Sequence, residues 1–380
     1  MLYEILVPLS RYFTPFNVFR YITFRAAGAA VTALLIAFVI GPYIIRWLKR
    51  KQMVQEIREG TPEAHQKKKD TPSMGGIIIV AAGVIPVLLW ARLDNTSVWI
   101  AVLATLWMGG IGFLDDYLKM KQKREGKKNE GLVERYKLLG QVTLGIAMGV
   151  YLWQNPLSAL PGASTTLPFF KNLIVTPIIP ALGFLYVAWV AFVLTGFTNA
   201  VNLTDGLDGL ASGLCGIAFA AFSLFAYVQG RIDASQWLQL FYFPEAGELS
   251  VVCLAFFGAA VGFLWFNAHP AQVFMGDTGA LAMGGALGAL GILLKSEFLL
   301  VIIGGVFVAE TTSVFLQRYV FKYRKARYGV DYAKANRLFL RAPIHHHFEV
   351  KGWPETQVVV RFWIMGILCA FLALATLKVR

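Results

Sequence analysis

The sequence predicts an all-α integral membrane protein with about ten transmembrane helices. Of its 380 residues, 57% are hydrophobic, above the roughly 45–50% that is usual in soluble domains. Only 15% are charged, against about 25% in soluble domains. The hydrophobic residues also gather in runs close to the length of about 20 residues that a helix needs to cross a bilayer. This composition excludes a soluble enzyme, a disordered chain and a disulfide-rich secreted module.

The apolar runs extend over the whole chain, so we expect a single polytopic membrane domain comprising residues 1–380. Several runs are rich in glycine and alanine, which allow helices to pack closely in lipid. The segment 154–180 is rich in Pro, Ser and Thr and is expected to be irregular or re-entrant. The basic segment 318–355 is expected to include an interfacial helix. The ten runs are 22–47, 74–91, 97–114, 138–153, 181–198, 209–229, 249–266, 279–294, 297–317 and 357–377.

The distribution of basic residues predicts the orientation of the chain. Lys and Arg collect on the cytoplasmic side of membrane proteins. With ten spans, 26 of the 35 basic residues fall in loops on one side, within 46–72, 117–137 and 318–361. The loops 199–208 and 267–278 lie on the same side. We therefore expect these five segments in the cytoplasm and both termini on the periplasmic side. The net charge of +13 is explained by this asymmetry and does not indicate nucleic-acid binding.

The three cysteines do not predict a disulfide framework or a zinc site. Cys215, Cys253 and Cys369 all lie in apolar runs and show no CxxC spacing. Buried thiols in such surroundings behave as small hydrophobic side chains.

Adjacent carboxylates end the third apolar run. Asp115 and Asp116 repel each other, and a proton or a divalent cation relieves that repulsion. At the carboxyl end of a helix the macrodipole also disfavours negative charge. A hydrated helix end is the simpler interpretation, but carboxylates near a membrane core are functional candidates.

A second polar group follows the fifth run, and its members recur every third residue. That spacing puts them on one face of a helix or tight turn. Asn side chains both donate and accept hydrogen bonds, which suits a sugar or a nucleobase. A turn between two spans needs fewer polar groups. The candidates are Asn199, Asn202, Asp205 and Asp208.

Two further segments carry candidate ligands. Asp277 lies between Gly276 and Thr278 at the start of a glycine-rich run, where its carboxylate suits Mg²⁺, and Phe274 is able to stack on a base. The segment His345–His347 is a run of three histidines in a basic loop. Adjacent histidines do not converge on zinc as i, i+4 pairs do, so phosphate or sugar contacts fit better.

Carboxylates, amides and lysines on one membrane face are the groups expected at a phosphoryl-transfer site, because catalysis of that reaction consists largely of positioning and charge stabilisation. No P-loop and no kinase motif occurs. Two readings from other classes remain. A cation-coupled transporter would place its carboxylates near the midplane, and a purely structural scaffold leaves the spaced acids unexplained.

Five motifs, in this order, resemble those of the phospho-N-acetylmuramoyl-pentapeptide transferases, a branch of the polyprenyl-phosphate hexosamine-1-phosphate transferases. The resemblance covers nearly the whole chain, and the first and last motifs favour this branch over transferases that use UDP-N-acetylglucosamine. The motifs are TPSMGG (71–76), GFLDDYLK (112–119), NAVNLTDGLDGL (199–210), FMGDTGAL (274–281) and PIHHHFE (343–349).

The resemblance implies an enzyme of the bacterial cytoplasmic membrane that depends on Mg²⁺ and is a homodimer. Its reaction transfers phospho-MurNAc-pentapeptide from UDP-MurNAc-pentapeptide to undecaprenyl phosphate, giving lipid I and UMP, the first membrane step of peptidoglycan synthesis. It further implies catalytic roles for Asp115, Asp116 and Asp277, with Asp115 as the base and Asp277 as the Mg²⁺ ligand. Donor-binding residues by the same resemblance are Lys68, Ser73, Lys137, Asn199, Asn202, Asp205, Asp208, Phe274, His345, His346 and His347.

Overall fold

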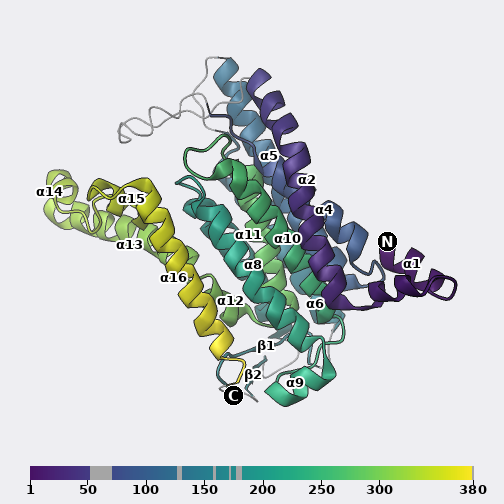
Figure 1. Cartoon of the computed structure of the whole chain (residues 1–380). Coiled ribbons are helices and arrows are strands. Elements are labelled where there is room, and N and C mark those ends of the chain that lie inside the picture. The colour runs from purple at the N-terminus through teal and green to yellow at the C-terminus, as the bar shows by residue number, and fades with distance from the viewer. Residues whose placement is uncertain (52–70, 126–130, 157–159, 171–172, 177–181, 379–380) are drawn as a thin grey trace.

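The computed structural model is a bundle of helices whose long members run roughly side by side (Figure 1). It describes residues 1–380 except 52–70, 126–130, 157–159, 171–172, 177–181 and 379–380. The first half contains α1 (Leu2–Leu9), η1 (Thr14–Arg20), α2 (Ile22–Arg50), α4 (Gly76–Trp90), α5 (Thr96–Arg124), α6 (Glu134–Gln154) and α7 (Gly183–Thr204). The second half contains α8 (Leu210–Gln229), α9 (Ile232–Leu238), α10 (Ala246–Asn267), α11 (Gly276–Leu293), α12 (Glu297–Ile303), α13 (Gly305–Tyr328), α14 (Val330–Ala335), α15 (Ile344–Val350) and α16 (Glu355–Ala375).

The prediction of a helical protein with several membrane spans is confirmed. Each of the ten apolar runs coincides with a helix, and the run 297–317 is divided between α12 and α13. Within the described ranges, seven helices are long and apolar enough to cross a membrane, or eight if α12 and α13 form one span. These two helices meet at an angle of 86° beside Gly304. The count of ten spans and the orientation stay predictions.

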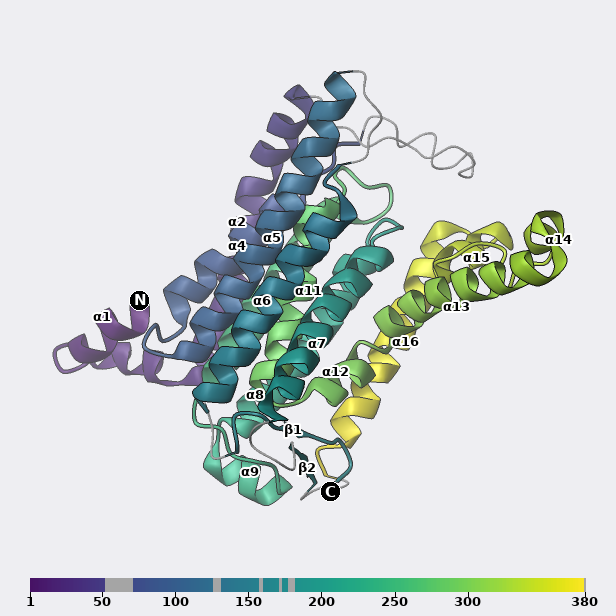
Figure 2. The same cartoon turned by 180° about the vertical axis from the view of Figure 1, so that it is seen from behind.

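Two predictions about loops are refined. In the described part of 154–180 the chain forms a small antiparallel sheet, so the protein is not wholly α. Strand β1 (Thr165–Thr166) pairs with β2 (Ile174–Val175), with Thr165 opposite Val175. The basic stretch 318–355 is helical in α13, α14 and α15, and α13 leads away from the bundle to α14 (Figure 2).

The core is built around α10 and α11. Helix α11 is buried almost throughout and packs against α4, α5 and α7. Small residues make this possible, because they let helix backbones approach closely. At Gly112 of α5 a Cβ atom would lie 2.2 Å from the carbonyl oxygen of Asp277. This close approach brings the carboxylates of α5 to the first turn of α11.

Candidate active site at the start of helix α11

Asp116 of α5 fixes the start of α11. Its Oδ1 accepts a hydrogen bond from the backbone amide of Asp277 at 3.2 Å. Its Oδ2 accepts from the amide and the hydroxyl of Thr278, at 2.9 and 2.7 Å. The first amides of a helix have no partner within the helix, and a carboxylate there is also favoured by the helix dipole. Asp116 therefore acts as a cap supplied by a different helix, and it orients Asp277.

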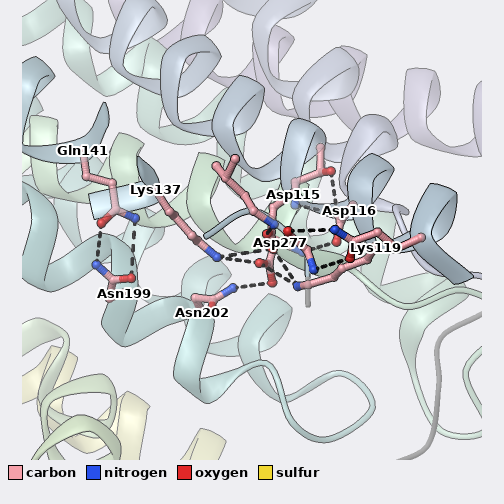
Figure 3. Close-up of polar contacts among 12 residues, drawn as sticks. Asp115, Asp116, Lys119, Lys137, Gln141, Asn199, Asn202 and Asp277 are labelled. Atoms are coloured by element: carbon pink, nitrogen blue, oxygen red, sulfur yellow. Dashed lines mark hydrogen bonds and ion pairs between the residues drawn. The ribbon is translucent and has the colours of Figure 1, made fainter. Parts of the chain in front are cut away.

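Asp115 and Asp277 meet two ammonium groups in a compact centre (Figure 3). Lys119 lies 2.6 Å from Asp115 Oδ2 and 3.1 Å from Asp277 Oδ2. Lys137 lies 2.5 Å from Asp277 Oδ2 and 3.6 Å from Asp115 Oδ2. Each ammonium group therefore contacts Oδ2 of both aspartates, which brings the carboxyl groups of Asp115 and Asp277 close together. Two negative and two positive charges thus share one pocket between α5, α6 and α11.

The start of α6 is positioned by the same carboxylate. Asp115 Oδ1 accepts a hydrogen bond from the Leu132 amide at 2.7 Å. Just before it, Gly131 has a φ of +67° and exchanges hydrogen bonds with the Gln122 side chain. This turn directs the first helical turn of α6, and with it Lys137, toward Asp277.

The two asparagines of α7 have different surroundings. Asn202 donates a hydrogen bond to Asp277 Oδ1 at 2.9 Å. Asn199, one turn earlier, donates to Gln141 Oε1 at 2.7 Å and to the Thr195 carbonyl oxygen at 2.8 Å. Asn202 thus belongs to the charged centre, while Asn199 joins α7 to α6 at its edge (Figure 3).

The donor set fits a divalent cation. Mg²⁺ prefers carboxylate and other oxygen ligands, and Asp115 and Asp277 present them side by side. In this structure Lys119 and Lys137 neutralise the same oxygens. A cation bound by these carboxylates would compete with the ammonium groups for Asp277 Oδ2.

The motif at 71–76 lies against the motif at 274–279 through backbone hydrogen bonds. The Phe274 amide donates to the Pro72 carbonyl oxygen, and the Gly75 amide donates to the Phe274 carbonyl oxygen, each at 2.8 Å. Ser73 Oγ would lie 3.0 Å from a Cβ at Gly276, so its hydroxyl is beside the Asp116 cap. The Phe274 side chain is half-buried.

Asp205 follows the last turn of α7 and lies beside the Gly276 backbone amide. Burial, together with the nearby carboxylates of Asp277 and Asp116, raises the pKa of Asp205 to about 8. A proton on this side chain, or a cation near it, relieves the accumulated negative charge.

Asp208 lies in a neighbouring cluster. Its Oδ2 accepts from the Ala271 amide at 3.1 Å and lies 3.2 Å from His269 Nδ1. Its backbone amide donates to Glu355 Oε1 at 2.8 Å. Ligand atoms of Asp208, His269 and Glu355 lie within 4.8 Å of one another. Asp205 and Asp208, three residues apart in sequence, therefore belong to two neighbouring clusters, the first near Asp277 and the second with His269 and Glu355.

The three histidines of α15 point in different directions. His345 is fully buried and lies 3.0 Å from Glu310 of α13. His346 lies 2.6 Å from Glu349, and burial lowers its pKa despite this carboxylate. His347 accepts a hydrogen bond from the Leu340 amide at 3.1 Å. Only the second and third rings are partly exposed.

Several residues of the site were not predicted from the sequence, and one predicted residue cannot be placed. Lys119 was available as an i, i+4 partner of Asp115 in the motif GFLDDYLK, a spacing at which charged side chains meet on a helix. Gln141, His269 and Glu355 gave no local signal, because their partners are far away in the chain. Lys68 lies outside the described residues.

An elongated apolar cavity of about 1060 Å³ opens beside the centre. It is lined by α6, α7, α12 and α13, from Asn199 near one end to Glu297 near the other. Asn199 is one helical turn from Asn202, which contacts Asp277. The lining includes the exposed side chains of Phe184, Phe192 and Phe315. The cavity is therefore open at the surface of the bundle, and Asn199 connects it to the charged centre.

Sequence comparisons identify the class of protein. The model of glycosyl transferase family 4 matches residues 98–295, and this range contains most of the centre. The fold and the site thus define a membrane-embedded member of glycosyl transferase family 4. Phospho-N-acetylmuramoyl-pentapeptide-transferase signature 1 matches residues 68–80.

Relatives that match over the full length identify the family within this class. A phospho-N-acetylmuramoyl-pentapeptide-transferase of Gemmatimonas aurantiaca is 65% identical over 380 residues, covering all of both chains. One from Desulfotalea psychrophila is 47% identical, also over the whole of both chains. One from Chlorobium chlorochromatii is 47% identical and covers 97% of this chain and 96% of its own. The chain belongs to the phospho-N-acetylmuramoyl-pentapeptide-transferase family.

Proposed function

We propose that this protein transfers phospho-MurNAc-pentapeptide from UDP-MurNAc-pentapeptide to undecaprenyl phosphate, giving lipid I and UMP. The observation that carries the proposal is the convergence of Asp115, Lys119, Lys137 and Asp277 beside an apolar cavity. Full-length identity to transferases with that name supports the donor. A water-soluble donor and a lipid acceptor need such a junction between a charged centre and an apolar groove.

The acceptor is assigned to the cavity between α6, α7, α12 and α13. Its lining is almost wholly apolar, which suits an isoprenoid chain, since burial of apolar surface is favourable in proportion to area. Its Asn199 end would present the lipid phosphate to the neighbouring lysines. Lys119 and Lys137 supply positive charge for the phosphate groups.

The proposed chemistry is attack of an oxygen of the lipid phosphate on the β-phosphorus of the donor. A new phosphorus–oxygen bond forms, and the bond from the β-phosphorus to the oxygen bridging to the α-phosphate breaks, so that UMP leaves. Asp115, which lies within reach of both ammonium groups, accepts the proton of the acceptor phosphate. Asp116 keeps Asp277 in register through the cap on α11.

We further propose that Asp277 is the principal Mg²⁺ ligand, with Asp115 beside it. These carboxylates would hold a Mg²⁺ ion whose charge would offset that of the diphosphate and of the leaving oxygen. Donor contacts are assigned to Asn202, Asp205 and Asp208. The other proposed donor contacts are Lys68, Ser73, Asn199, Phe274, His346 and His347, the two histidines of the motif that are partly exposed.

The membrane arrangement is part of the proposal. Among the described residues, seven helices are long and apolar enough to cross the membrane. We propose that α4, α6 and the bent pair α12–α13 also cross it, which gives ten spans. An even number leaves both termini on one side, and the basic loops favour the periplasm for them. We propose a multi-pass homodimer in the bacterial cytoplasmic membrane that acts from the cytoplasmic face.

Donor specificity tests the proposal. Purified protein in detergent, with undecaprenyl phosphate and Mg²⁺, is offered UDP-MurNAc-pentapeptide or UDP-N-acetylglucosamine in parallel. We expect UMP release with the first donor, abolished by EDTA. Release with the second donor alone would retain the chemistry and refute the substrate. Solute flux across proteoliposomes without a lipid product would favour a transporter instead.

A further inference from the structure

The first of the three histidines has an environment unlike that of a ligand-binding side chain. His345 and Glu310 are both 0% exposed, and His345 Nδ1 lies 3.0 Å from Glu310 Oε2. Glu310 belongs to α13, which begins at Gly305 beside the bend, and His345 belongs to α15. The pair therefore fixes the imidazole ring from one side, inside the protein.

The opposite edge of the ring lies against Gly206. A Cβ atom at position 206 would be 2.3 Å from His345 Nε2 and 2.9 Å from its Cε1. His345 Nε2 and Glu310 Oε1 are buried and have no hydrogen-bond partner among the described residues. The contact between ring and loop is thus one of close packing, and the ring is not free to swing away because Glu310 holds it.

Gly206 lies in the short loop that carries Asp205 and Asp208. Elsewhere this loop is held by Glu355, which accepts a hydrogen bond from the Asp208 amide at 2.8 Å, and by Asn267, which accepts from the Gly209 amide at 3.1 Å. Both of those contacts lie at the Asp208 end of the loop. At the other end the Asp205 side chain lies beside the Gly276 amide, and His345 packs against the intervening Gly206.

We propose that Glu310 and His345 are positioning residues that hold the loop 205–209 in the geometry that binds the donor, and that His345 does not itself touch the substrate. The inference rests on the proposed function for its donor. It divides the triple-histidine motif, since His346 and His347 are partly exposed and stay available for ligand contacts.

Steric compensation tests the contact. In Gly206→Ala the new methyl group collides with a ring that cannot move, so we expect the KM for UDP-MurNAc-pentapeptide to rise at least tenfold. His345→Ala should raise the same KM with little change in the KM for undecaprenyl phosphate. In the double variant the methyl group occupies space left by the ring, so its donor KM should be lower than that of Gly206→Ala.

The matched control is Gly110→Ala, because a Cβ at Gly110 of α5 meets nothing within 4 Å; its donor KM should equal that of the parent protein, and its Tm should be no lower, since Ala is favoured over Gly inside a helix. Glu310→Gln introduces an amide that is still able to hydrogen-bond the His345 ring, so this variant should lose less donor affinity than Glu310→Ala. The same compensation is measured independently of enzyme activity by comparing the Tm of the double variant with the Tm of each single variant.

Two results would overturn the inference. One is independent penalties of Gly206→Ala and His345→Ala, so that in the double variant their fold-changes in donor KM multiply and their shifts in Tm add. The other is a His345→Ala protein with unchanged donor KM and reduced kcat, which would make His345 a catalytic group. Failure of the parent protein to release UMP, with compensation still present in Tm, would refute the proposed function and leave the contact intact.

Discussion

Replacing Asp116 tests whether its main work is structural. The Asp116→Ala change removes an 8% exposed carboxylate that accepts three hydrogen bonds from Asp277 and Thr278. A hydrogen bond to a charged group contributes about 1.5–3 kcal/mol. Because the three are not additive and water partly replaces them, we expect a loss of about 3–5 kcal/mol, as for other buried charged networks. With about 2–4 °C per kcal/mol in larger domains, Tm should fall by roughly 6–20 °C.

The assay is thermal unfolding of purified protein in detergent, measured beside UMP release. Asp115→Asn is the matched control, since it keeps an acceptor oxygen for the Leu132 amide while removing the charge that faces Lys119. We expect this variant to lose turnover with little change in Tm. An Asp116→Ala protein with the Tm of the parent would refute the capping role, as would equal destabilisation by both variants.

Three further predictions follow from the same geometry. Asp277→Asn should abolish UMP release and Mg²⁺ binding measured by calorimetry, while circular dichroism shows a folded protein; near-normal turnover would contradict the metal assignment. Gly196→Phe projects a ring into the apolar cavity, where a Cβ meets nothing within 4 Å, and should raise the KM for undecaprenyl phosphate at least several-fold with the donor KM unchanged. The raised pKa of Asp205, about 8, means that the folded protein holds a proton that the unfolded chain releases near pH 4. The stability from this group is present in full below about pH 4 and is lost progressively as the pH rises to 8, so the Tm of Asp205→Asn should rise relative to that of the parent between pH 5 and pH 9; parallel Tm–pH curves would contradict this.

Much of the fold follows from the sequence because membrane helices carry a strong local signal. About 20 apolar residues in a row specify a helix when no water can satisfy the backbone. The bend beside Gly304 was not predicted, since the apolar run 297–317 continues across it without a proline. The small sheet formed by Thr165 and Val175 was also missed, because a two-residue pairing leaves no periodic pattern.

The site is harder to predict than the fold, since its geometry arises from contacts between distant helices. Adjacent Asp115 and Asp116 look alike in sequence, yet one faces two lysines and the other caps α11. The regular spacing of Asn202, Asp205 and Asp208 suggested one face, but the helix ends at Thr204 and the loop sends Asp208 to His269. In the triple histidine, burial of His345 against Gly206 has no local signature.

The stoichiometry of the products tests the central claim most directly. Purified protein is reconstituted in vesicles that contain undecaprenyl phosphate, supplied with UDP-MurNAc-pentapeptide and Mg²⁺, and analysed by mass spectrometry for UMP and for lipid-linked product. The account predicts one UMP for each undecaprenyl-diphosphoryl-MurNAc-pentapeptide formed, and neither product with Asp277→Asn. UMP without the lipid product, UDP in place of UMP, or full activity of that variant would contradict it.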